Sequence, residues 1–332
     1  MERPLTVAVL AGGLTHEREI SLHSGRRVAA SLRNSGIQAK ILDVDAQLLQ
    51  RLDALEPDVV WPLVHGSTGE DGALQDLLQL ADYPFVGSEA GACRLASDKA
   101  VAASVLQRFD VHVPASIALP QPLFREVGVG AILDLVEREF GFPVVIKPTR
   151  GGSSLGLTIA TERSALPGAM VDCFAYGEVA LIQQYVSGRE FGVGVVDYGD
   201  GPLAMPPVEV TVNGPYDFDA RYNPGRAEYF VPARVDNIVI DKLKECALKV
   251  HKHLGLRHYS RTDIILDDDG HTWFIDVNST PGMTETSIFP QAAQAQARLE
   301  GRSVDALYLD ILKAAAIHAD QHANDVAEAD AQ

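Results

Sequence analysis

Two carboxylates and an amide lie close together in the stretch RTDIILDDDGHTWFIDVNSTPGM, near the carboxyl end of the chain. Two β-rich runs flank Asp269 and Gly270, a dipeptide typical of a two-residue hairpin turn. Counting back from that turn pairs Asp263 with Asp276 and Arg261 with Asn278. These four polar side chains would then share one face of the hairpin, because side chains alternate between the two faces of a strand.

Opposed carboxylates repel each other, so this face favours a bound cation. Mg²⁺ takes oxygen ligands and commonly joins carboxylates to nucleotide phosphates. A solvated edge whose acids are only surface charge is the alternative, and it is weakened by Asn278 and by the Gly and Pro loop that follows. The opposite face is expected to pack on a core through Ile264, Leu266, Trp273, Ile275 and Val277.

A second group of polar residues is typical of a phosphate site. Lys147 ends the apolar run VVIKP and is followed by a loop with Ser153 and Ser154 between glycines. Backbone N–H groups and hydroxyls of such a loop can approach phosphate closely, while lysine supplies a point charge. Lys99, at the start of a helix, is a second candidate. A plain flexible connector and a solvated surface lysine are the alternatives.

Two further candidates follow apolar runs near the amino end. Glu17 in AGGLTHERE and His65 in PLVHGSTGEDG come after predicted parallel strands, whose carboxyl ends bind ligands in open α/β sheets. Glu17 could hold an ammonium group or simply favour a helix start. His65 could face the same crevice or be a bystander. Arg221 and Tyr222 lie in a long polar loop at about residues 211–226, which is typical of a lid.

The elements that position these residues predict an α/β protein. Residues 1–100 alternate apolar runs with helical periodicity, which indicates a parallel sheet flanked by helices. The prolines of VHVPASIALP indicate a connector. Residues 101–190 and 191–318 are expected to form two further units, the last of α+β type, and 319–332 a flexible tail.

Composition narrows the functional classes. The 332 residues carry 28 Lys and Arg against 45 Asp and Glu, a net charge of −17 that disfavours binding to nucleic acid or to an anionic membrane. The three cysteines lack metal-ligand spacing and are expected to be buried thiols. A first strand close to the initial Met, with no apolar leader before it, favours a cytoplasmic protein.

Eight motifs occur in one order along nearly the whole chain, and together they resemble the D-alanine:D-alanine ligases of the ATP-grasp superfamily. They are AGGLTHEREISLHSG, VHGSTGEDGALQ, SDK, VIKPTRGGSSLG, SGREF, YDFDARY, RTD and IDVNSTPGMTETS. The resemblance implies a fold of three subdomains with ATP bound between the central and C-terminal ones. It also implies that ATP phosphorylates one D-alanine and that the amine of a second D-alanine attacks the acyl phosphate.

The resemblance assigns roles to individual residues. The catalytic and substrate-binding group comprises Glu17, His65, Ser153, Tyr222, Arg261, Gly282, Ser287 and Ile288, with Glu17 on the first substrate's ammonium and Arg261 and the Gly282 backbone on the oxyanion. The ATP group comprises Lys99, Lys147, Ser153, Ser154, Gln183, Gln184, Val186, Glu190 and Arg221. The metal ligands are Asp263, Asp276 and Asn278, normally for two Mg²⁺ or Mn²⁺ ions. Activation by K⁺ and a homodimer are also implied.

Four positions depart from the family pattern. Gln183 replaces an adenine-contacting Glu, Arg221 a lid Lys, Asp276 a longer metal-bridging Glu, and Ile288 a Leu near the acceptor. A ligase that uses D-lactate as acceptor, a ligase for other amino acids and a degenerate nucleotide-binding protein are therefore alternatives. Tyr222 argues against the first, and the retained catalytic residues argue against the last. An oxidoreductase is disfavoured because AGGLTHERE lacks dinucleotide-binding glycine spacing.

Overall fold

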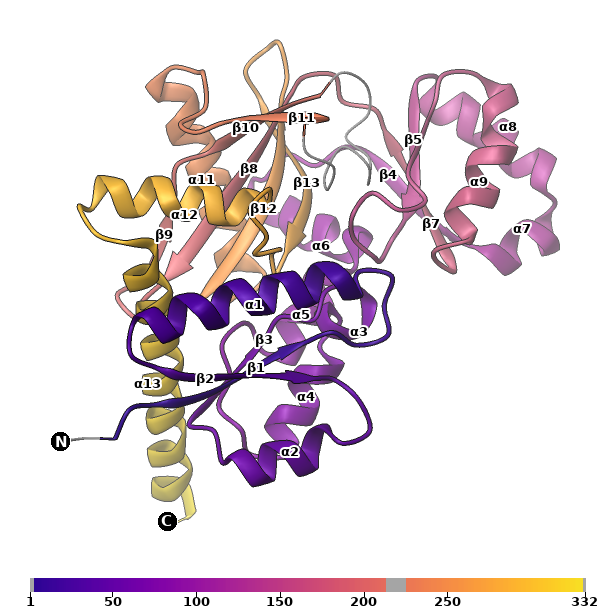
Figure 1. Ribbon diagram of the computed structural model, residues 1–332. Coiled ribbons are helices and arrows are strands. Elements are labelled where there is room, and N and C mark those ends of the chain that lie inside the picture. Colours follow the sequence, from indigo (N-terminus) through magenta and orange to yellow (C-terminus); the bar gives the residue numbers. More distant parts are fainter. Residues whose placement is uncertain (1–2, 213–224, 331–332) are drawn as a thin grey trace.

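The computed structural model describes residues 3–212 and 225–330, and the side chains among them except those of residues 67 and 318–330. Within this part of the chain the strands form sheets of three, six and four strands (Figure 1). The first is parallel and the other two are antiparallel. The expected α/β class with an α+β C-terminal part is confirmed.

The N-terminal sheet has the order β2-β1-β3, with strands β1 (Thr6–Ala11), β2 (Gln38–Asp43) and β3 (Val59–Pro62). Its helices are α1 (Arg18–Asn34), α2 (Leu48–Leu55), α3 (Ser67–Glu70), α4 (Ala73–Leu80) and α5 (Ala90–Ser97). Helix α1 lies very close to β1, since a Cβ on Gly25 would come within 2.6 Å of the Ala11 Cβ. The loops after β1 and β3 emerge at the same edge because the strands are parallel.

The four-stranded sheet has the order β4-β7-β5-β6, with β4 (Ser116–Pro120), β5 (Val144–Pro148), β6 (Thr158–Ala160) and β7 (Val179–Gln184). Figure 1 shows its helices together on one side. They are α7 (Gln121–Val127), α8 (Val129–Phe140) and α9 (Leu166–Phe174), with a short 3-10 turn at Arg163–Ala165. The expectation of a mere connector at VHVPASIALP is wrong in part, because Ser116–Pro120 pairs with β7 as an edge strand, where proline is tolerated.

The six-stranded sheet has the order β11-β10-β8-β12-β13, with β9 paired to β8. Its strands are β8 (Arg189–Asp197), β9 (Pro202–Ala204), β10 (Val208–Val212), β11 (Ala227–Phe230), β12 (Tyr259–Leu266) and β13 (Thr272–Asn278). The helices packed with it are α6 (Lys99–Leu106), continued by the 3-10 turn Gln107–Phe109, α11 (Asn237–His253) and α12 (Ile288–Leu299). Helix α6 thus shares a core with α11, although a boundary at residue 101 would assign most of it to the central unit.

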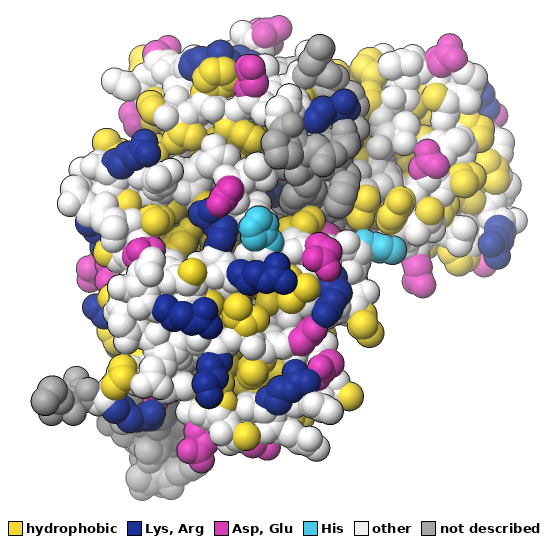
Figure 2. Space-filling model, viewed as in Figure 1, with side chains coloured by type: hydrophobic (Ala, Val, Ile, Leu, Met, Phe, Trp, Pro, Cys, Tyr) yellow, Lys and Arg dark blue, Asp and Glu magenta, His cyan; other side chains and the backbone are white. Residues whose placement is uncertain are grey.

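The N-terminal and C-terminal sheets share a core. Trp61 on β3 donates a 3.3 Å hydrogen bond to the hydroxyl of Tyr259 on β12, and both side chains are fully buried. The last helix, α13 (Val304–Asp330), packs along α1. The sequence predicts a flexible tail from residue 319, but the helix continues to Asp330. Figure 2 shows Lys and Arg side chains gathered on the N-terminal part of the face that it views.

The β12–β13 hairpin keeps the expected polar pairs but not the expected turn. Asp263 lies opposite Asp276 and Arg261 opposite Asn278, as predicted. The turn is longer than two residues: Asp267 and His271 are joined by a backbone hydrogen bond, and Gly270 has φ +80°. A β-bulge after Asp263 on this strand pair shifts the register by one residue and cancels the error.

The shifted register between the turn and the bulge changes which side chains reach the core. Phe274, not Trp273 or Ile275, is buried beside Ile264, so the prediction for those two residues is wrong. Ile264, Leu266 and Val277 are buried as predicted. Ile275 instead joins Ile265 in lining a cavity.

Candidate active site

A cavity of about 740 Å³ lies between the four-stranded and the six-stranded sheets. One part of its lining is apolar, and side chains from both sheets contribute to it. These are Val145, Leu157 and Ile159 from the four-stranded sheet and its loops, and Ile265 and Ile275 from the hairpin. Apolar walls from two sheets suit a flat aromatic ring such as a nucleobase.

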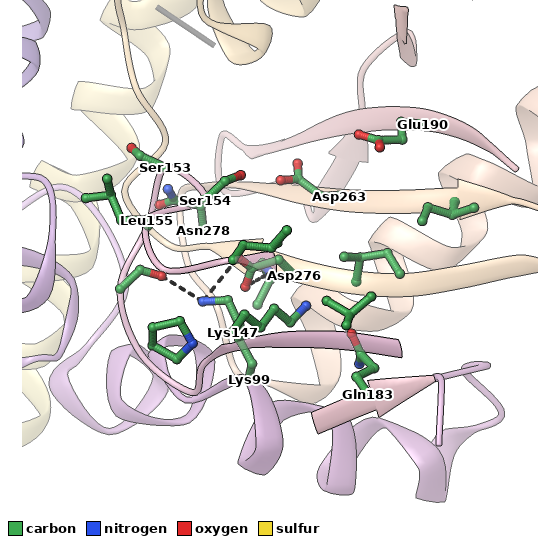
Figure 3. A pocket seen from close by; sticks show the side chains of 18 of the residues that line it. Lys99, Lys147, Ser153, Ser154, Leu155, Gln183, Glu190, Asp263, Asp276 and Asn278 are labelled. Atoms are coloured by element: carbon green, nitrogen blue, oxygen red, sulfur yellow. Dashed lines mark hydrogen bonds and ion pairs between the residues drawn. The ribbon is translucent and has the colours of Figure 1, made fainter. Parts of the chain in front are cut away.

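Polar side chains surround this apolar part of the cavity. Gln183 is buried on β7, opposite Val145 of β5, and the polar residues Gln184 and Glu190 follow it in the lining, with the apolar Val186 between them. An amide can both donate and accept hydrogen bonds, so Gln183 can recognise a base without carrying charge. Figure 3 shows Gln183 and Glu190 on different sheets around the same cavity.

The other part of the cavity carries the two predicted lysines (Figure 3). Lys147 is only 4% exposed on β5, and Lys99 begins helix α6. The Lys99 ammonium donates a 2.7 Å hydrogen bond to the carbonyl oxygen of Gly151 and lies 3.4 Å from Oδ2 of Asp276. Two cations beside a loop of glycine and serine can hold a polyphosphate.

The loop itself has an uncommon backbone. Ser153 and Ser154 both lie in the left-handed region, with φ of +57° and +59°. Such conformations are costly for residues with a Cβ and occur mostly where the surroundings enforce them, often at functional sites. Here the hydroxyl of Ser153 donates a short hydrogen bond to Oε1 of Glu17, which ties the loop to the N-terminal sheet.

The predicted metal ligands lie on the hairpin face that lines the cavity. Asp263 accepts two hydrogen bonds from the guanidinium of Arg261, at 2.7 and 3.0 Å. Asp276 faces Lys99, so each carboxylate has a cationic neighbour that offsets their mutual repulsion. The three side chains offer oxygen donors only, which fits a hard divalent cation such as Mg²⁺.

A smaller cavity of about 40 Å³ shares five lining residues with the larger one: Glu70, Ser153, Arg261, Asn278 and Ile288. Its lining contains all the predicted substrate residues that the structure describes, namely Glu17, His65, Ser153, Arg261, Gly282, Ser287 and Ile288, together with Glu70 and Thr286. The two cavities therefore place a group bound in one next to a group bound in the other.

Glu17 is the main anionic group of the small cavity. It is 6% exposed, and the neighbouring glycines leave room for its carboxylate: a Cβ on Gly66 would come within 2.9 Å of Oε2, and one on Gly152 within 3.2 Å of Oε1. A buried carboxylate is stable beside hydrogen-bond donors or a cation. The carboxylate of Glu17 can therefore hold an ammonium group.

His65 follows β3 and is fixed from two sides. Its Nε2 lies 2.9 Å from the hydroxyl of Ser24 on α1, and its Nδ1 lies 3.7 Å from Oε1 of Glu70. The hydroxyl of Thr15 also donates a 2.8 Å hydrogen bond to the carbonyl oxygen of His65. Glu17 and His65 both line the small cavity.

The opposite wall of the small cavity comes from the loop before α12. The Ser287 hydroxyl lies 2.7 Å from that of Thr284, and a Cβ on Gly282 would come within 2.9 Å of Ser287 Oγ. Ile288 packs on Gly192 of β8, where an added Cβ would meet it at 2.6 Å. Glycine at both positions lets the loop and the helix approach the sheet closely.

Some residues fall outside what the structure describes, and others were missed. Arg221, Tyr222 and most of the expected lid at residues 211–226 lie outside the described residues. Sequence reasoning missed Glu70, Thr286 and Ser24. Glu70 had a signal, because it follows His65 by five residues in the same loop and helix. Ser24 lies within the motif AGGLTHEREISLHSG, but a serine within a helix suggests no chemistry by its type alone.

The fold and the paired cavities define an ATP-grasp protein, in which two sheets hold nucleotide between them. A family model described as the D-ala D-ala ligase C-terminus matches residues 105–307, and the model for the D-ala D-ala ligase N-terminus matches residues 46–88. The chain is 35% identical over 316 residues to a D-alanine–D-alanine ligase of Geotalea uraniireducens (strain Rf4), covering 95% of this chain and 97% of the relative. The chain belongs to the D-alanine–D-alanine ligase family.

Other relatives also match most of the chain. A D-alanine–D-alanine ligase of Fervidobacterium nodosum (strain ATCC 35602 / DSM 5306 / Rt17-B1) is 34% identical over 299 residues, covering 87% of this chain and 93% of the relative. The solved D-alanine-D-alanine ligase from Coxiella burnetii superposes with a TM-score of 0.80 at 21% identity, covering 97% of both chains. The VanG D-Ala:D-Ser ligase from Enterococcus faecalis superposes with a TM-score of 0.76 at 24% identity, covering 94% of this chain and 100% of the other. These two structures are similar in fold.

Two smaller observations complete the comparison with the sequence. All three cysteines are buried free thiols, as predicted. Among the described residues, no helix is both long enough and apolar enough to cross a membrane.

Proposed function

We propose that the protein joins two D-alanine molecules into D-alanyl-D-alanine, with ATP converted to ADP and phosphate. The observation that carries this proposal is the contact between the two cavities through Ser153, Arg261 and Asn278. A carboxylate held in the small cavity lies next to the terminal phosphate of a nucleotide held in the large one. The product is a precursor dipeptide for peptidoglycan.

In the first step a carboxylate oxygen of the first D-alanine attacks the γ-phosphorus of ATP, giving an acyl phosphate and ADP. Glu17 holds the ammonium of this D-alanine, and His65 lines the same wall. Lys99 and Lys147 neutralise charge on the phosphates. Most of the rate enhancement in such a transfer comes from positioning and from electrostatic stabilisation.

In the second step the neutral amine of the second D-alanine attacks the acyl carbon. A tetrahedral intermediate forms, and its collapse forms the amide and expels phosphate. Arg261 and the Gly282 N–H stabilise the oxyanion, a role in which one donor is typically worth about 10²–10³ in rate. Ser287 and Ile288 border the second D-alanine, and the proton that the amine loses during the attack is taken up by the departing phosphate.

The hairpin face supplies the divalent cation site of this proposal. Asp263, Asp276 and Asn278 would hold the ion, and its chemistry is neutralisation of phosphate charge. Two Mg²⁺ ions, replaceable by Mn²⁺, are the expected occupancy, although Asp276 is one methylene shorter than Glu. Activation by K⁺ and a homodimer remain predictions from the family resemblance. Use of ATP and the free thiols support a cytoplasmic location.

Amino-acid-dependent phosphate release tests the proposal. The full chain is incubated with ATP, Mg²⁺ and K⁺ at pH 7 to 9, with D-alanine, D-serine or D-lactate as acceptor, and the products are identified by mass spectrometry. We expect D-alanyl-D-alanine and one phosphate per dipeptide. If the enzyme preferred D-lactate or D-serine to D-alanine and formed the corresponding mixed product, that compound would be the acceptor instead of D-alanine. No phosphate release with D-alanine from folded protein would refute the ligase.

A further inference from the structure

Ser24 joins two walls of the small cavity without lining it. The side chain is fully buried on α1. Its hydroxyl oxygen accepts a 3.0 Å hydrogen bond from the backbone N–H of Met283 and lies 2.9 Å from Nε2 of His65. One hydroxyl thus connects the histidine on the first-substrate wall to the backbone on the oxyanion wall, across 259 residues of sequence.

A hydroxyl offers one proton and two lone pairs, so Ser24 can bond Met283 and His65 at once. Of these two partners only the imidazole can accept the Ser24 proton, because the Met283 N–H is itself a donor. In that arrangement the neutral imidazole carries its own proton on Nδ1, the nitrogen that lies 3.7 Å from Glu70. In the other tautomer Nε2–H donates to the second lone pair of the Ser24 oxygen. In both tautomers Ser24 holds the Met283 N–H beside His65.

The backbone of Gly282 and Met283 gains most from this restraint. The Met283 N–H belongs to the peptide plane that follows Gly282, whereas the Gly282 N–H belongs to the plane that precedes it. Fixing the following plane holds the Cα and carbonyl of Gly282 in place, so only φ of Gly282 separates its N–H from this anchor. Glycine is conformationally permissive, and its N–H would otherwise point in varied directions. The Met283 side chain is buried in the core and anchors the other side of this peptide.

We propose that Ser24 is a positioning residue that aligns the Gly282 N–H with the oxyanion of the tetrahedral intermediate. The inference rests on the proposed ligase function. Ser24 acts through Gly282 and His65 and does not contact substrate. A misalignment of about 1 Å can reduce a rate by about 10²-fold, so loss of the Ser24 hydroxyl should act mainly on kcat.

Ser31 provides a matched control on the same helix. It lies seven residues further on, therefore on nearly the same face of α1, and its hydroxyl donates a hydrogen bond to Asp305 of α13. Like Ser24, it ties α1 to the C-terminal part of the chain, but its partner Asp305 lines neither cavity. Ser31→Ala therefore reports the structural cost of such a bond without a change at the oxyanion wall.

The experiment compares Ser24→Ala, Ser24→Cys and Ser31→Ala with the wild type. For Ser24→Ala we expect kcat about 10-fold to 100-fold lower, with KM for ATP within twofold. Binding of a phosphinate analogue of the tetrahedral intermediate should weaken by a similar factor, because the analogue needs the same N–H. Ser24→Cys has a similar volume and weaker hydrogen bonds, so its kcat and analogue affinity should lie between those of Ser24→Ala and the wild type. It replaces Ser24→Ala in the comparison if that variant does not fold. Ser31→Ala should keep kcat and analogue affinity.

Two results would overturn the inference. One is a Ser24→Ala enzyme whose kcat and analogue affinity equal those of Ser31→Ala. The other is a loss confined to KM for D-alanine, with kcat and analogue affinity unchanged. Failure of the ligase proposal looks different, because the wild-type protein itself would then release no phosphate with D-alanine.

Discussion

The ammonium of Lys99 lies 3.4 Å from Oδ2 of Asp276, so a lysine of the expected phosphate site is paired with a carboxylate of the expected metal site. The side chains are 11% and 29% exposed, which places the pair inside the cavity. Arg261 pairs with Asp263 in the same way on the neighbouring strand. Without nucleotide, the protein's own cations would therefore compete for both carboxylates with a metal ion at the proposed site. A nucleotide that draws Lys99 to its phosphates would release Asp276.

This competition predicts that Lys99→Met binds metal more tightly when nucleotide is absent. Removing one partly buried ion pair should raise Mn²⁺ affinity by roughly fivefold, while ATP affinity falls. Titration of free Mn²⁺ by electron paramagnetic resonance measures the first effect without any need for turnover. Lys249→Met removes a lysine paired with Glu245 on the surface and should leave Mn²⁺ affinity unchanged. Equal Mn²⁺ affinities in Lys99→Met and the wild type would contradict the prediction.

Substitution of Asp276 should have a larger effect, this time on catalysis. Asp276→Asn removes one negative charge from the cation site and should lower kcat by about 10²–10³, measured by ADP formation at saturating substrates. Asp276→Glu keeps the charge, extends its reach and should lower the Mg²⁺ concentration needed for half-maximal rate. Asp269→Asn, on the exposed hairpin turn, should keep kcat within twofold of wild type. If Asp276→Asn and Asp269→Asn had similar kcat values, Asp276 would not be a ligand of the catalytic cation.

The hydrogen bond from Ser153 to Glu17 predicts the behaviour of Ser153→Ala. The variant loses the donor that orients the carboxylate and relaxes a loop held in the left-handed region. We expect kcat/KM for D-alanine to fall by about 10-fold to 100-fold, since misplaced binding groups cost about that much. Steady-state kinetics at saturating ATP measure the change. Ser164 also donates a hydrogen bond to a glutamate, Glu162, but on the surface, so Ser164→Ala is a matched control. Its kcat/KM for D-alanine is expected to equal that of the wild type. A loss of kcat/KM in both variants would indicate general destabilisation.

The hairpin illustrates how far the sequence determines the site. Alternation of side chains and a turn signal at Asp269-Gly270 located the polar pairs correctly, because strand pairing is local and has a fixed period. The longer turn and the bulge were not predictable in the same way. Both leave the composition of the strands unchanged, and their effects on the register cancel beyond the bulge, where Asp263 pairs with Asp276 and Arg261 with Asn278. The burial of Phe274 in place of Trp273 and Ile275 follows from the longer turn, which pairs Phe274 with Ile264 on the turn side of the bulge.

Ser24 shows the other limit. Motif reasoning located residues whose types already suggest chemistry, such as Glu17 and Lys147. The role of Ser24 depends on a bond to Met283, and that bond depends on how α1 and the loop before α12 pack together. A single sequence holds no local signal for such a contact. The same limit applies to the pairing of Lys99 with Asp276, which are contributed by different elements of the fold.

A buried histidine away from the site predicts how stability changes with pH. His251 on α11 is 2% exposed, and its Nδ1 lies 2.8 Å from the hydroxyl of Ser260. Burial lowers the pKa of His251 to about 4, and the charge of Asp197 opposes that shift only in part. In the unfolded chain the pKa is about 6.5. As pH falls from about 6.5 to about 4, the unfolded state therefore gains a proton that the folded state does not, and stability is lost.

The loss of stability caused by protonation of His251 is large enough to be tested with His251→Gln, whose amide can still form a hydrogen bond with Ser260. Between pH 7 and pH 5 the protonation of His251 should lower the free energy of unfolding of the wild type by about 2 kcal/mol. Urea unfolding at the two pH values measures this loss, and it should be smaller by about that amount in His251→Gln. His23→Gln replaces an exposed histidine on α1 and should retain the wild-type dependence. If His251→Gln lost as much stability as the wild type over this interval, His251 would not be the group that the unfolded chain protonates.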